Sequence, residues 1–300
     1  MNNADSYQQR IREICPDLSV RSAIFNAEGL YNDVVIVNDE LVFRFPKDES
    51  ASKNLTGEIN ILRLLKNNIT LNVPAPFYES HDCIAYRLIP GKALRRDLIL
   101  KLDEDSMQSV ANQLATFHKE LHGVPVDRLR DLNIPIADAL MEYDDFIKLY
   151  EHIKEKVFPH LLPHAREWAR DHFESFLIDE RNFEFEAKLI HGDLGPYHVM
   201  YNLQENRVNG IIDFGCAGLG DPAIDFAILI QHYGESVLNR FYRVYPEIPK
   251  YLKRARFYAG TWELRWALIG IESGDISWFM CHIGDARDIK FDLPIMGAAG

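Results

Sequence analysis

The chain has 300 residues, 47% of them hydrophobic, which is enough for one large or two smaller hydrophobic cores. Its formal net charge of −12 would repel nucleic acid and anionic lipid and would attract a cationic small molecule. Because the four cysteines form no Cys-x-x-Cys pair and no apolar run approaches the ~18 residues of a membrane span, we expect a cytoplasmic protein with no membrane or nucleic-acid partner.

The first part of the chain has the pattern of β-strands. Residues 34–37 and 41–45 are strand-like, and the polar residues 38–40 between them predict a hairpin turn. Residues 26–33, which include Gly29, precede this hairpin and can form a turn that covers phosphate with backbone N–H groups. The sequence therefore predicts a small antiparallel sheet.

A charged pair is predicted within this part. Glu58 lies on the apolar face of its own predicted helix, in line with Ile61, Leu62 and Leu65. In the strand at residues 41–45, alternation places Arg44 opposite the face that carries the aromatic side chains. We predict an ion pair between Arg44 and Glu58. The alternative is that Glu58 reaches solvent and Arg44 is a solvated edge charge.

The pattern changes near residue 90, after which helical spacing dominates. Residues 106–122 carry apolar side chains at helical spacing, and Gly123 can end that helix. We therefore divide the chain into an N-terminal lobe, residues 1–90, and a helical C-terminal lobe, residues 91–300. A cleft is expected between the two lobes.

Four polar residues stand at the ends of short strands predicted at residues 188–190, 199–201 and 208–212. They are His191, Asp193, His198 and Asp213. Two carboxylates and two imidazoles held at strand ends can surround a metal-bound phosphate, which predicts a phosphoryl-transfer site. The same four residues also fit a metal-dependent hydrolase that needs no nucleotide. A nucleotide-binding module without activity is the third reading.

These motifs resemble the aminoglycoside phosphotransferase family over residues 25–283, nearly the whole chain. The resemblance implies an α+β, protein-kinase-like fold of two lobes, with a small antiparallel-sheet N-lobe and a larger, mainly helical C-lobe. It implies a kinase that transfers the γ-phosphate of ATP or GTP to a hydroxyl group, with Mg²⁺ as cofactor and Mn²⁺ as a substitute. An antibiotic, aminoglycoside before macrolide, is the implied acceptor. An amino alcohol or sugar is a further alternative, and we expect a monomer.

The resemblance also implies roles for single residues. Arg44, held by Glu58, would grip the α- and β-phosphates, and main-chain groups near Arg87 and Ile89 would bind the purine. Gly29 would lie in the turn over the phosphates. Asp193 would orient the acceptor hydroxyl and accept its proton, and the metal ligands would be His198 and Asp213. His191 and Asp225 would brace the catalytic loop, while Asp221 and Pro222 match a helix N-cap and first turn.

One departure from the family pattern concerns the metal site. The family often has asparagine where this chain has His198, and Mg²⁺ prefers oxygen ligands. A histidine at this position resembles the pattern of the 2″-aminoglycoside and macrolide kinases, and the run Arg44-Phe45-Pro46-Lys47 resembles the pattern of the macrolide kinases. The histidine in place of asparagine therefore indicates that the chain resembles this subgroup of the family.

The substrate side is predicted from charge and aromatic content. A polycationic acceptor would need carboxylates, for which the candidates are Glu235, Glu263, Glu272 and Asp275. A large, partly apolar ring would instead need aromatic side chains, for which the candidates are Trp262, Trp266, Trp278 and Phe279. The helical spacing of Tyr258, Trp262, Trp266 and Ile269 also fits ordinary core packing.

Overall fold

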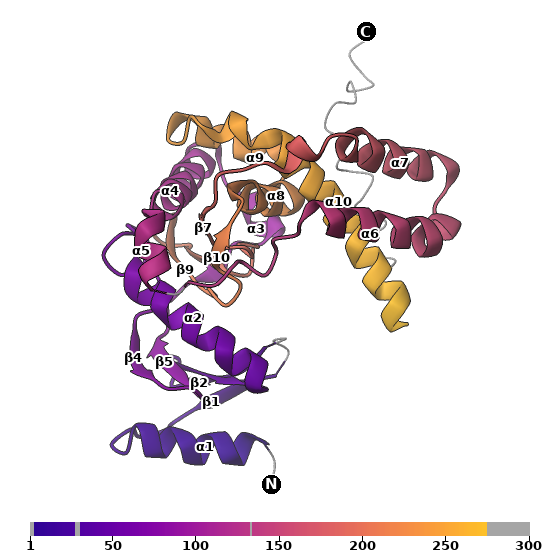
Figure 1. Ribbon diagram of the computed structural model, residues 1–300. Coiled ribbons are helices and arrows are strands. Elements are labelled where there is room, and N and C mark those ends of the chain that lie inside the picture. Colours follow the sequence, from indigo (N-terminus) through magenta and orange to yellow (C-terminus); the bar gives the residue numbers. More distant parts are fainter. Residues whose placement is uncertain (1–2, 28–30, 133, 275–300) are drawn as a thin grey trace.

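The protein is seen in a computed structural model that describes residues 3–27, 31–132 and 134–274. A smaller, sheet-containing part and a larger, mainly helical part are joined by the segment that leaves strand β5 (Figure 1). The predicted α+β, kinase-like two-lobe fold is confirmed. No helix in the described ranges combines the length and the apolar composition needed to cross a membrane.

The smaller part is a five-stranded antiparallel sheet of order β1-β2-β3-β5-β4 with one helix on each face (Figure 1). Its elements are α1 (Asn3–Ile14), β1 (Ala23–Asn26), β2 (Asn32–Val37), β3 (Leu41–Pro46), α2 (Glu49–Leu65), β4 (Pro76–Glu79) and β5 (Ile84–Arg87). Phe43 and Phe45 pack with Ile11 of α1, while Val42 and Ile84 on the opposite face pack with α2.

The hairpin predicted at residues 38–40 is present between β2 and β3. Asn38 and Asp39 have φ angles of +56° and +55°, a left-handed conformation that Asn and Asp tolerate better than most residues. The turn sets the register in which Val34 faces Arg44 across the two strands. Local turn chemistry thus fixes where Arg44 stands in the sheet.

The sequence analysis assigned no element to residues 3–14, which the structure shows as α1. Tyr7, Ile11 and Ile14 recur at i, i+4 and i+7 and cover the sheet, although the segment as a whole is polar. Three apolar residues at helical spacing are too few to predict a helix from the sequence. Packing of their side chains against the sheet stabilises the segment as a helix.

The larger part is built from helices around two small sheets, of order β10-β7 and β6-β8-β9. Its helices are α3 (Arg96–Ile99), α4 (Glu104–His122), α5 (Val126–Asp131), α6 (Tyr143–His152), α7 (Pro163–Leu177), α8 (Pro222–Tyr233), α9 (Glu235–Leu238) and α10 (Leu252–Ser273). Its strands are β6 (Lys92–Ala93), β7 (Lys188–Ile190), β8 (Val199–Asn202), β9 (Arg207–Ile211) and β10 (Gly218–Gly220). Short helical turns occupy Ile153–Val157, Phe158–His160, Glu180–Phe183, Asn239–Arg243 and Ile248–Lys250.

Most predicted elements of this part are confirmed, with shifts of one or two residues at their ends. Helix α4 begins earlier than predicted because Asp103 caps it, accepting a hydrogen bond of 2.8 Å from the Ser106 amide. The cap predicted for α8 is confirmed, since the Asp221 side chain accepts from the Ala223 amide and Pro222 is the first helical residue. These signals depend only on neighbours in sequence.

The two parts also touch away from the connecting segment. The amide of Ile211, on β9, donates to the carbonyl oxygen of Asn72 at 2.8 Å, and the Asn209 amide group donates to the carbonyl oxygen of Pro90 at 2.6 Å. The boundary proposed between residues 90 and 91 falls between β5 of the first sheet and β6 of the second. These two hydrogen bonds join the larger part to residues 72 and 90 of the smaller part and the connecting segment.

Candidate active site

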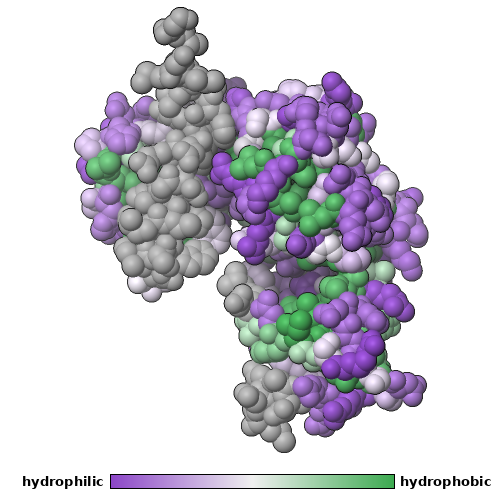
Figure 2. Space-filling view, turned by 180° about the vertical axis from the view of Figure 1, so that it is seen from behind, coloured by the Kyte–Doolittle hydropathy of each residue, from purple (hydrophilic) through white to green (hydrophobic). Residues whose placement is uncertain are grey.

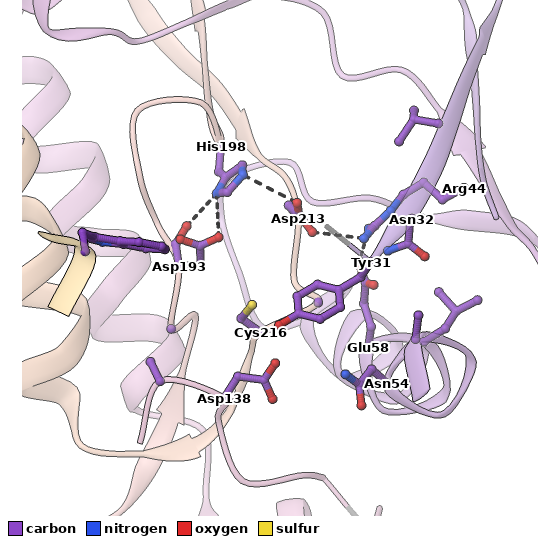
Figure 3. Close-up of a pocket in the computed structure, with 17 residues that line it drawn as sticks. Tyr31, Asn32, Arg44, Asn54, Glu58, Asp138, Asp193, His198, Asp213 and Cys216 are labelled. Carbon is purple, nitrogen blue, oxygen red and sulfur yellow. Dashed lines mark hydrogen bonds and ion pairs between the residues drawn. The ribbon is translucent and has the colours of Figure 1, made fainter. Parts of the chain in front are cut away.

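A cavity of about 460 Å³ lies between the two parts of the molecule. It is lined from one side by β3 and α2 and from the other by the loops that follow β7 and β9 (Figure 3). The space-filling view shows the surface hollowed at this level (Figure 2). The residues predicted for phosphate binding, metal binding and catalysis line the cavity together: Arg44, Glu58, Asp193, His198 and Asp213.

The predicted ion pair between Arg44 and Glu58 is present. Arg44 Nη1 lies 2.5 Å from Glu58 Oε1, and the two residues are only 5% and 2% exposed. Glu58 follows the same helix face as Ile61, Leu62 and Leu65, all fully buried, so its carboxylate enters the interior and meets the cation there. The second guanidinium nitrogen of Arg44 stays available to the cleft.

That second nitrogen reaches Asp213, at the end of the segment after β9. Arg44 Nη2 lies 3.1 Å from Asp213 Oδ1, so one planar guanidinium bridges two carboxylates (Figure 3). Asp213 has a φ of +64°, a conformation rarely adopted by a residue other than glycine. Burial alone would raise the pKa of Asp213, but Arg44 and His198 outweigh it and lower that pKa, so the carboxylate is ionised.

His198 stands between the two aspartates. Its Nδ1 donates to the carbonyl oxygen of Asp193 at 2.6 Å, and its Nε2 lies 3.5 Å from Asp213 Oδ2 (Figure 3). Because a carbonyl oxygen only accepts, Nδ1 carries a proton, and Nε2 is the nitrogen that faces Asp213. The backbone of the loop after β7 thereby leaves Nε2 as the nitrogen that could bind a metal.

Asp193 lies on the opposite side of His198, at the tip of the loop after β7. Burial within the cleft raises the pKa of Asp193 to about 6, and the negative charge of Asp213 adds to the rise, while His198 opposes it. A carboxylate whose pKa approaches neutrality is a better proton acceptor than one at its ordinary value. Asp193 is therefore suited to a general-base role.

The predicted bracing of this loop by His191 and Asp225 is present. The fully buried Asp225 carboxylate accepts hydrogen bonds from the amides of His191 (3.1 Å) and Gly192 (2.8 Å). His191 Nε2 donates to the carbonyl oxygen of Ile212 at 3.1 Å, and burial lowers the pKa of His191 to about 4. A neutral, buried imidazole that links two loops is structural.

The donor set fits a divalent cation that also binds phosphate. Among the described residues no cluster of three or more His, Cys, Asp or Glu side chains could hold a metal alone. The pair formed by Asp213 and His198 Nε2 supplies two ligands on one side, and Mg²⁺ in phosphoryl-transfer enzymes takes its remaining ligands from phosphates and water. The nitrogen ligand makes the pair equally suited to Mn²⁺.

The predicted nucleotide contacts Arg87 and Ile89 do not line this cavity; they line a separate pocket of about 300 Å³ that also includes Pro90. Arg87 ends β5 with its side chain exposed, and Ile89 is buried in the connecting segment. Lys47 Nζ donates to the carbonyl oxygen of Ala27 at 2.7 Å, so the residue that follows β1 is tied to the residue that follows β3. Gly29, proposed to cover the phosphates in the turn at residues 26–33, lies outside the described residues.

Only one of the predicted substrate residues that the structure describes lines the cavity. Trp266, on α10, lines the cavity, but Trp262, Glu235 and Glu263 do not. Glu235 is paired with Arg256 at 2.5 Å, Glu263 accepts from the Gln231 side chain at 2.5 Å, and Trp262 stacks on Tyr258. The expectation that these three face an acceptor is not met at this cavity, because their partners hold them in the core of the larger part. Asp275, Trp278 and Phe279 lie outside the described residues.

Sequence reasoning gave no role to Asp138 or Cys216 and placed Tyr31 only within the turn predicted at residues 26–33, yet all three residues line the cavity. Tyr31 projects from the start of the hairpin, and Asp138 and Cys216 stand on the opposite wall (Figure 3). Asp138 forms no ion pair or side-chain hydrogen bond with another described residue, and partial burial raises its pKa. No spacing or motif marks these residues in the sequence. Only the approach of the two parts brings them together.

Comparison with known proteins identifies related chains. The sequence profile of the phosphotransferase enzyme family matches residues 22–258, which include all six charged and imidazole residues of the cavity. The viomycin phosphotransferase of Streptomyces vinaceus is 27% identical over 223 residues, 71% of this chain and 74% of that protein. A GDP and kanamycin complex of a 2″-aminoglycoside phosphotransferase superposes with a TM-score of 0.82 at 27% identity, covering 95% of this chain and 98% of the other. A macrolide 2′-phosphotransferase type I shares the fold, with a TM-score of 0.70 at 21% identity over 95% and 98% of the two chains.

Proposed function

Since the chain belongs to the phosphotransferase enzyme family, we propose that it transfers the γ-phosphoryl group of ATP or GTP to a hydroxyl of an antibiotic, with an aminoglycoside as the first candidate. One observation carries the proposal. Arg44, Glu58, Asp193, His198 and Asp213, from both sides of the cleft, converge on a single cavity. This set contains a phosphate grip, a metal-binding pair and a base, which are the parts that phosphoryl transfer needs.

Each part has a distinct task in the proposed reaction. Arg44 holds the α- and β-phosphates of the donor, and Glu58 keeps its guanidinium in place. Asp193 accepts the proton of the acceptor hydroxyl as the oxygen attacks the γ-phosphorus in line and the nucleoside diphosphate leaves. The protein accelerates the reaction, relative to the reaction in solution, mainly by aligning donor and acceptor, because phosphoryl transfer needs little covalent participation by protein side chains.

His198 and Asp213 would hold Mg²⁺, or Mn²⁺ in its place. When bound, the cation supplies positive charge that stabilises the phosphate oxygens. The protein contributes the orientation of this pair, since the Asp193 carbonyl fixes the His198 ring and Arg44 fixes the Asp213 carboxylate.

The charge of the cavity favours a cationic acceptor. Arg44 is bound to Glu58 and Asp213, and Asp193 and Asp138 add two further carboxylates to the lining. Asp138 stands on the wall away from the phosphate grip, where an ammonium group of an aminoglycoside would be stabilised by it. The kanamycin in the related 2″-kinase complex supports an aminoglycoside as the first candidate, and the similarity to a viomycin phosphotransferase adds viomycin to the acceptors to be tested.

A macrolide is the second candidate acceptor. Trp266, Ala139 and Tyr31 line the same cavity, and such an aromatic and apolar lining suits a large, partly apolar ring. A small metabolite alcohol would leave most of this lining uncovered. The acceptor panel below separates these three classes.

The test measures release of nucleoside diphosphate by the purified protein with Mg²⁺ and either ATP or GTP. Kanamycin, viomycin, a macrolide and a small amino alcohol are added separately, with Asp193→Ala as the control. We expect stimulation by kanamycin or viomycin, a loss of about 10²–10⁴-fold in the variant because the base is missing, and unchanged nucleotide affinity. Near-normal turnover by Asp193→Ala would remove Asp193 from the mechanism. Metal-dependent turnover of an acceptor without nucleotide would favour a hydrolase, and nucleotide binding without transfer would favour an inactive binding module.

A further inference from the structure

A buried chain of hydrogen bonds leads away from the catalytic loop to a part of the larger lobe that does not line the candidate active-site cavity. It begins at Asp225 of α8, continues through His122 at the end of α4, and reaches Tyr245 in the turn before α10. His122 Nε2 lies 3.0 Å from Asp225 Oδ2, and its Nδ1 lies 3.2 Å from the Tyr245 hydroxyl. None of these three residues touches the candidate substrate or metal positions.

The chain has one consistent direction when the His122 ring is neutral. Asp225 can only accept, so His122 Nε2 donates to it, and Nδ1 then accepts from the Tyr245 hydroxyl. Both ring nitrogens are thereby used, and the His122 and Asp225 side chains are 1% and 0% exposed. The ring cannot turn without leaving a buried polar atom without its partner, which is costly.

Asp225 in turn has three donors. His122 Nε2 and the His191 amide share Oδ2, while the Gly192 amide binds Oδ1. Burial alone would raise the pKa of Asp225, but the hydrogen bond from His122 and nearby imidazoles lower it to about 2, so the carboxylate is ionised. Among the described residues His122 is the one side chain that donates to this carboxylate.

The loop on the other side of Asp225 is confined. Gly192 has a φ of +74°, and a Cβ atom there would lie 2.8 Å from the carbonyl oxygen of Cys216. Asp193 follows directly. A small rotation of the Asp225 carboxylate would therefore shift the two amides that set the direction of the Asp193 side chain, and misplacement of a reacting group by about 1 Å can cost about 10²-fold in rate.

We propose that His122 is a positioning residue for the phosphoryl-transfer reaction: anchored by Tyr245, it holds Asp225 in the rotamer that binds both loop amides and so keeps Asp193 aligned. This inference rests on the proposed function for its catalytic consequence. Its structural part, control of the loop amides by His122, stands independently of the acceptor.

A purely packing role for His122 makes a different prediction. The ring contacts Phe226 and Tyr245, with centroid distances of 5.6 Å and 5.8 Å, so a phenylalanine at this position would keep the packing and lose only the hydrogen bonds. Glutamine is the matched variant, because its side-chain amide can still donate to Asp225. Tyr245→Phe removes the hydroxyl that anchors the ring and leaves Asp225 its donor.

The experiment compares His122→Phe, His122→Gln and Tyr245→Phe with the wild type in the full chain. We expect His122→Phe to lower kcat by about 10–100-fold while KM for the nucleotide changes less than about twofold, with faster amide hydrogen exchange at Gly192. His122→Gln should retain kcat within about threefold, and Tyr245→Phe should fall between the two. A His122→Phe protein with wild-type kcat and wild-type exchange at Gly192 would overturn the inference.

The exchange measurement separates this inference from the proposed function. If the wild type phosphorylates none of the acceptors, the proposed function fails, while the exchange rate at Gly192 still decides whether His122 controls the loop. If His122→Phe does not fold, His122→Met, which also lacks a donor for Asp225, takes its place as the variant that breaks the chain. Unchanged protection of Gly192 in that variant then overturns the inference.

Discussion

At the scale of single residues, the site depends on side chains whose second polar atom is held by the backbone or by another charge. His198 is the clearest example, because its Nδ1 is committed to the Asp193 carbonyl and only Nε2 can reach a metal. Arg44 likewise gives one nitrogen to Glu58 and the other to Asp213. These second contacts fix the orientation of each side chain before any ligand binds.

His198→Asn tests the ligand role of this imidazole. Asparagine restores an oxygen ligand and has an N–H that can still donate toward the Asp193 carbonyl, so we expect turnover within about tenfold of the wild type with Mg²⁺ and a weaker response to Mn²⁺. His198→Ala, which supplies neither contact, should lose about 10–100-fold in metal affinity. Titration of each protein with both cations measures this. Complete inactivity of His198→Asn at saturating Mg²⁺ would assign a further task to the imidazole.

At the scale of elements, β3 and α2 are joined by a charged contact inside an apolar interface. Val42 of the strand and Leu55 and Ile59 of the helix belong to one buried apolar cluster, and the buried pair formed by Arg44 and Glu58 joins the same two elements. An ion pair of this kind adds little net stability compared with an apolar contact, but removing one partner leaves the other buried without compensation. The position of α2 is therefore sensitive to Glu58.

Glu58→Ala should lower the free energy of unfolding by about 3–5 kcal/mol, because the Arg44 guanidinium would remain buried with Asp213 as its remaining partner. Glu49→Ala on the same helix is the matched control. Glu49 forms an exposed pair with Lys53 at 3.1 Å, and loss of such a pair costs less than about 0.5 kcal/mol. Denaturant unfolding of both variants checks the difference. Equal losses of unfolding free energy in the two variants would mean that the buried ion pair contributes no more to stability than the exposed pair.

At the scale of the whole molecule, buried histidines link stability to pH. His118 and His191 are fully buried in the larger part, and burial lowers the pKa of each to about 4. In the unfolded chain their pKa returns to about 6.5. Below that value the unfolded state binds more protons than the folded state, so stability falls as the pH drops from about 6.5 toward 4.

His118→Phe isolates one of these protons. Its ring packs beside Phe117, Phe226 and Phe241, so phenylalanine preserves the aromatic surroundings and removes the titrating group. Between pH 7 and pH 5 we expect the wild type to lose about 2 kcal/mol more of its free energy of unfolding than the variant loses. Urea unfolding at the two pH values measures both losses. Parallel losses would show that His118 does not titrate on unfolding in this range.

Sequence reasoning succeeded where the physical cause is local. The β2–β3 hairpin, the Asp221 cap and the inward face of Glu58 all follow from the spacing of a few neighbouring residues, and the structure confirms them. The pairing of Arg44 with Glu58 could be predicted as well, because a carboxylate on a buried face requires a cation and the strand offers one. The roles of Asp193, His198 and Asp213 in catalysis remain predictions, although their common location is now seen.

Tertiary structure alone decided the rest. Tyr31, Asp138 and Trp266 line one cavity although they are far apart in the chain, and Glu235, which pairs with Arg256, does not line it. The link from Tyr245 through His122 to Asp225 joins three segments with no common motif. Local preferences act over a few residues and so determine turns, caps and helix faces. Which distant side chains share a cleft depends on how the two lobes and their helices pack, which no single segment encodes.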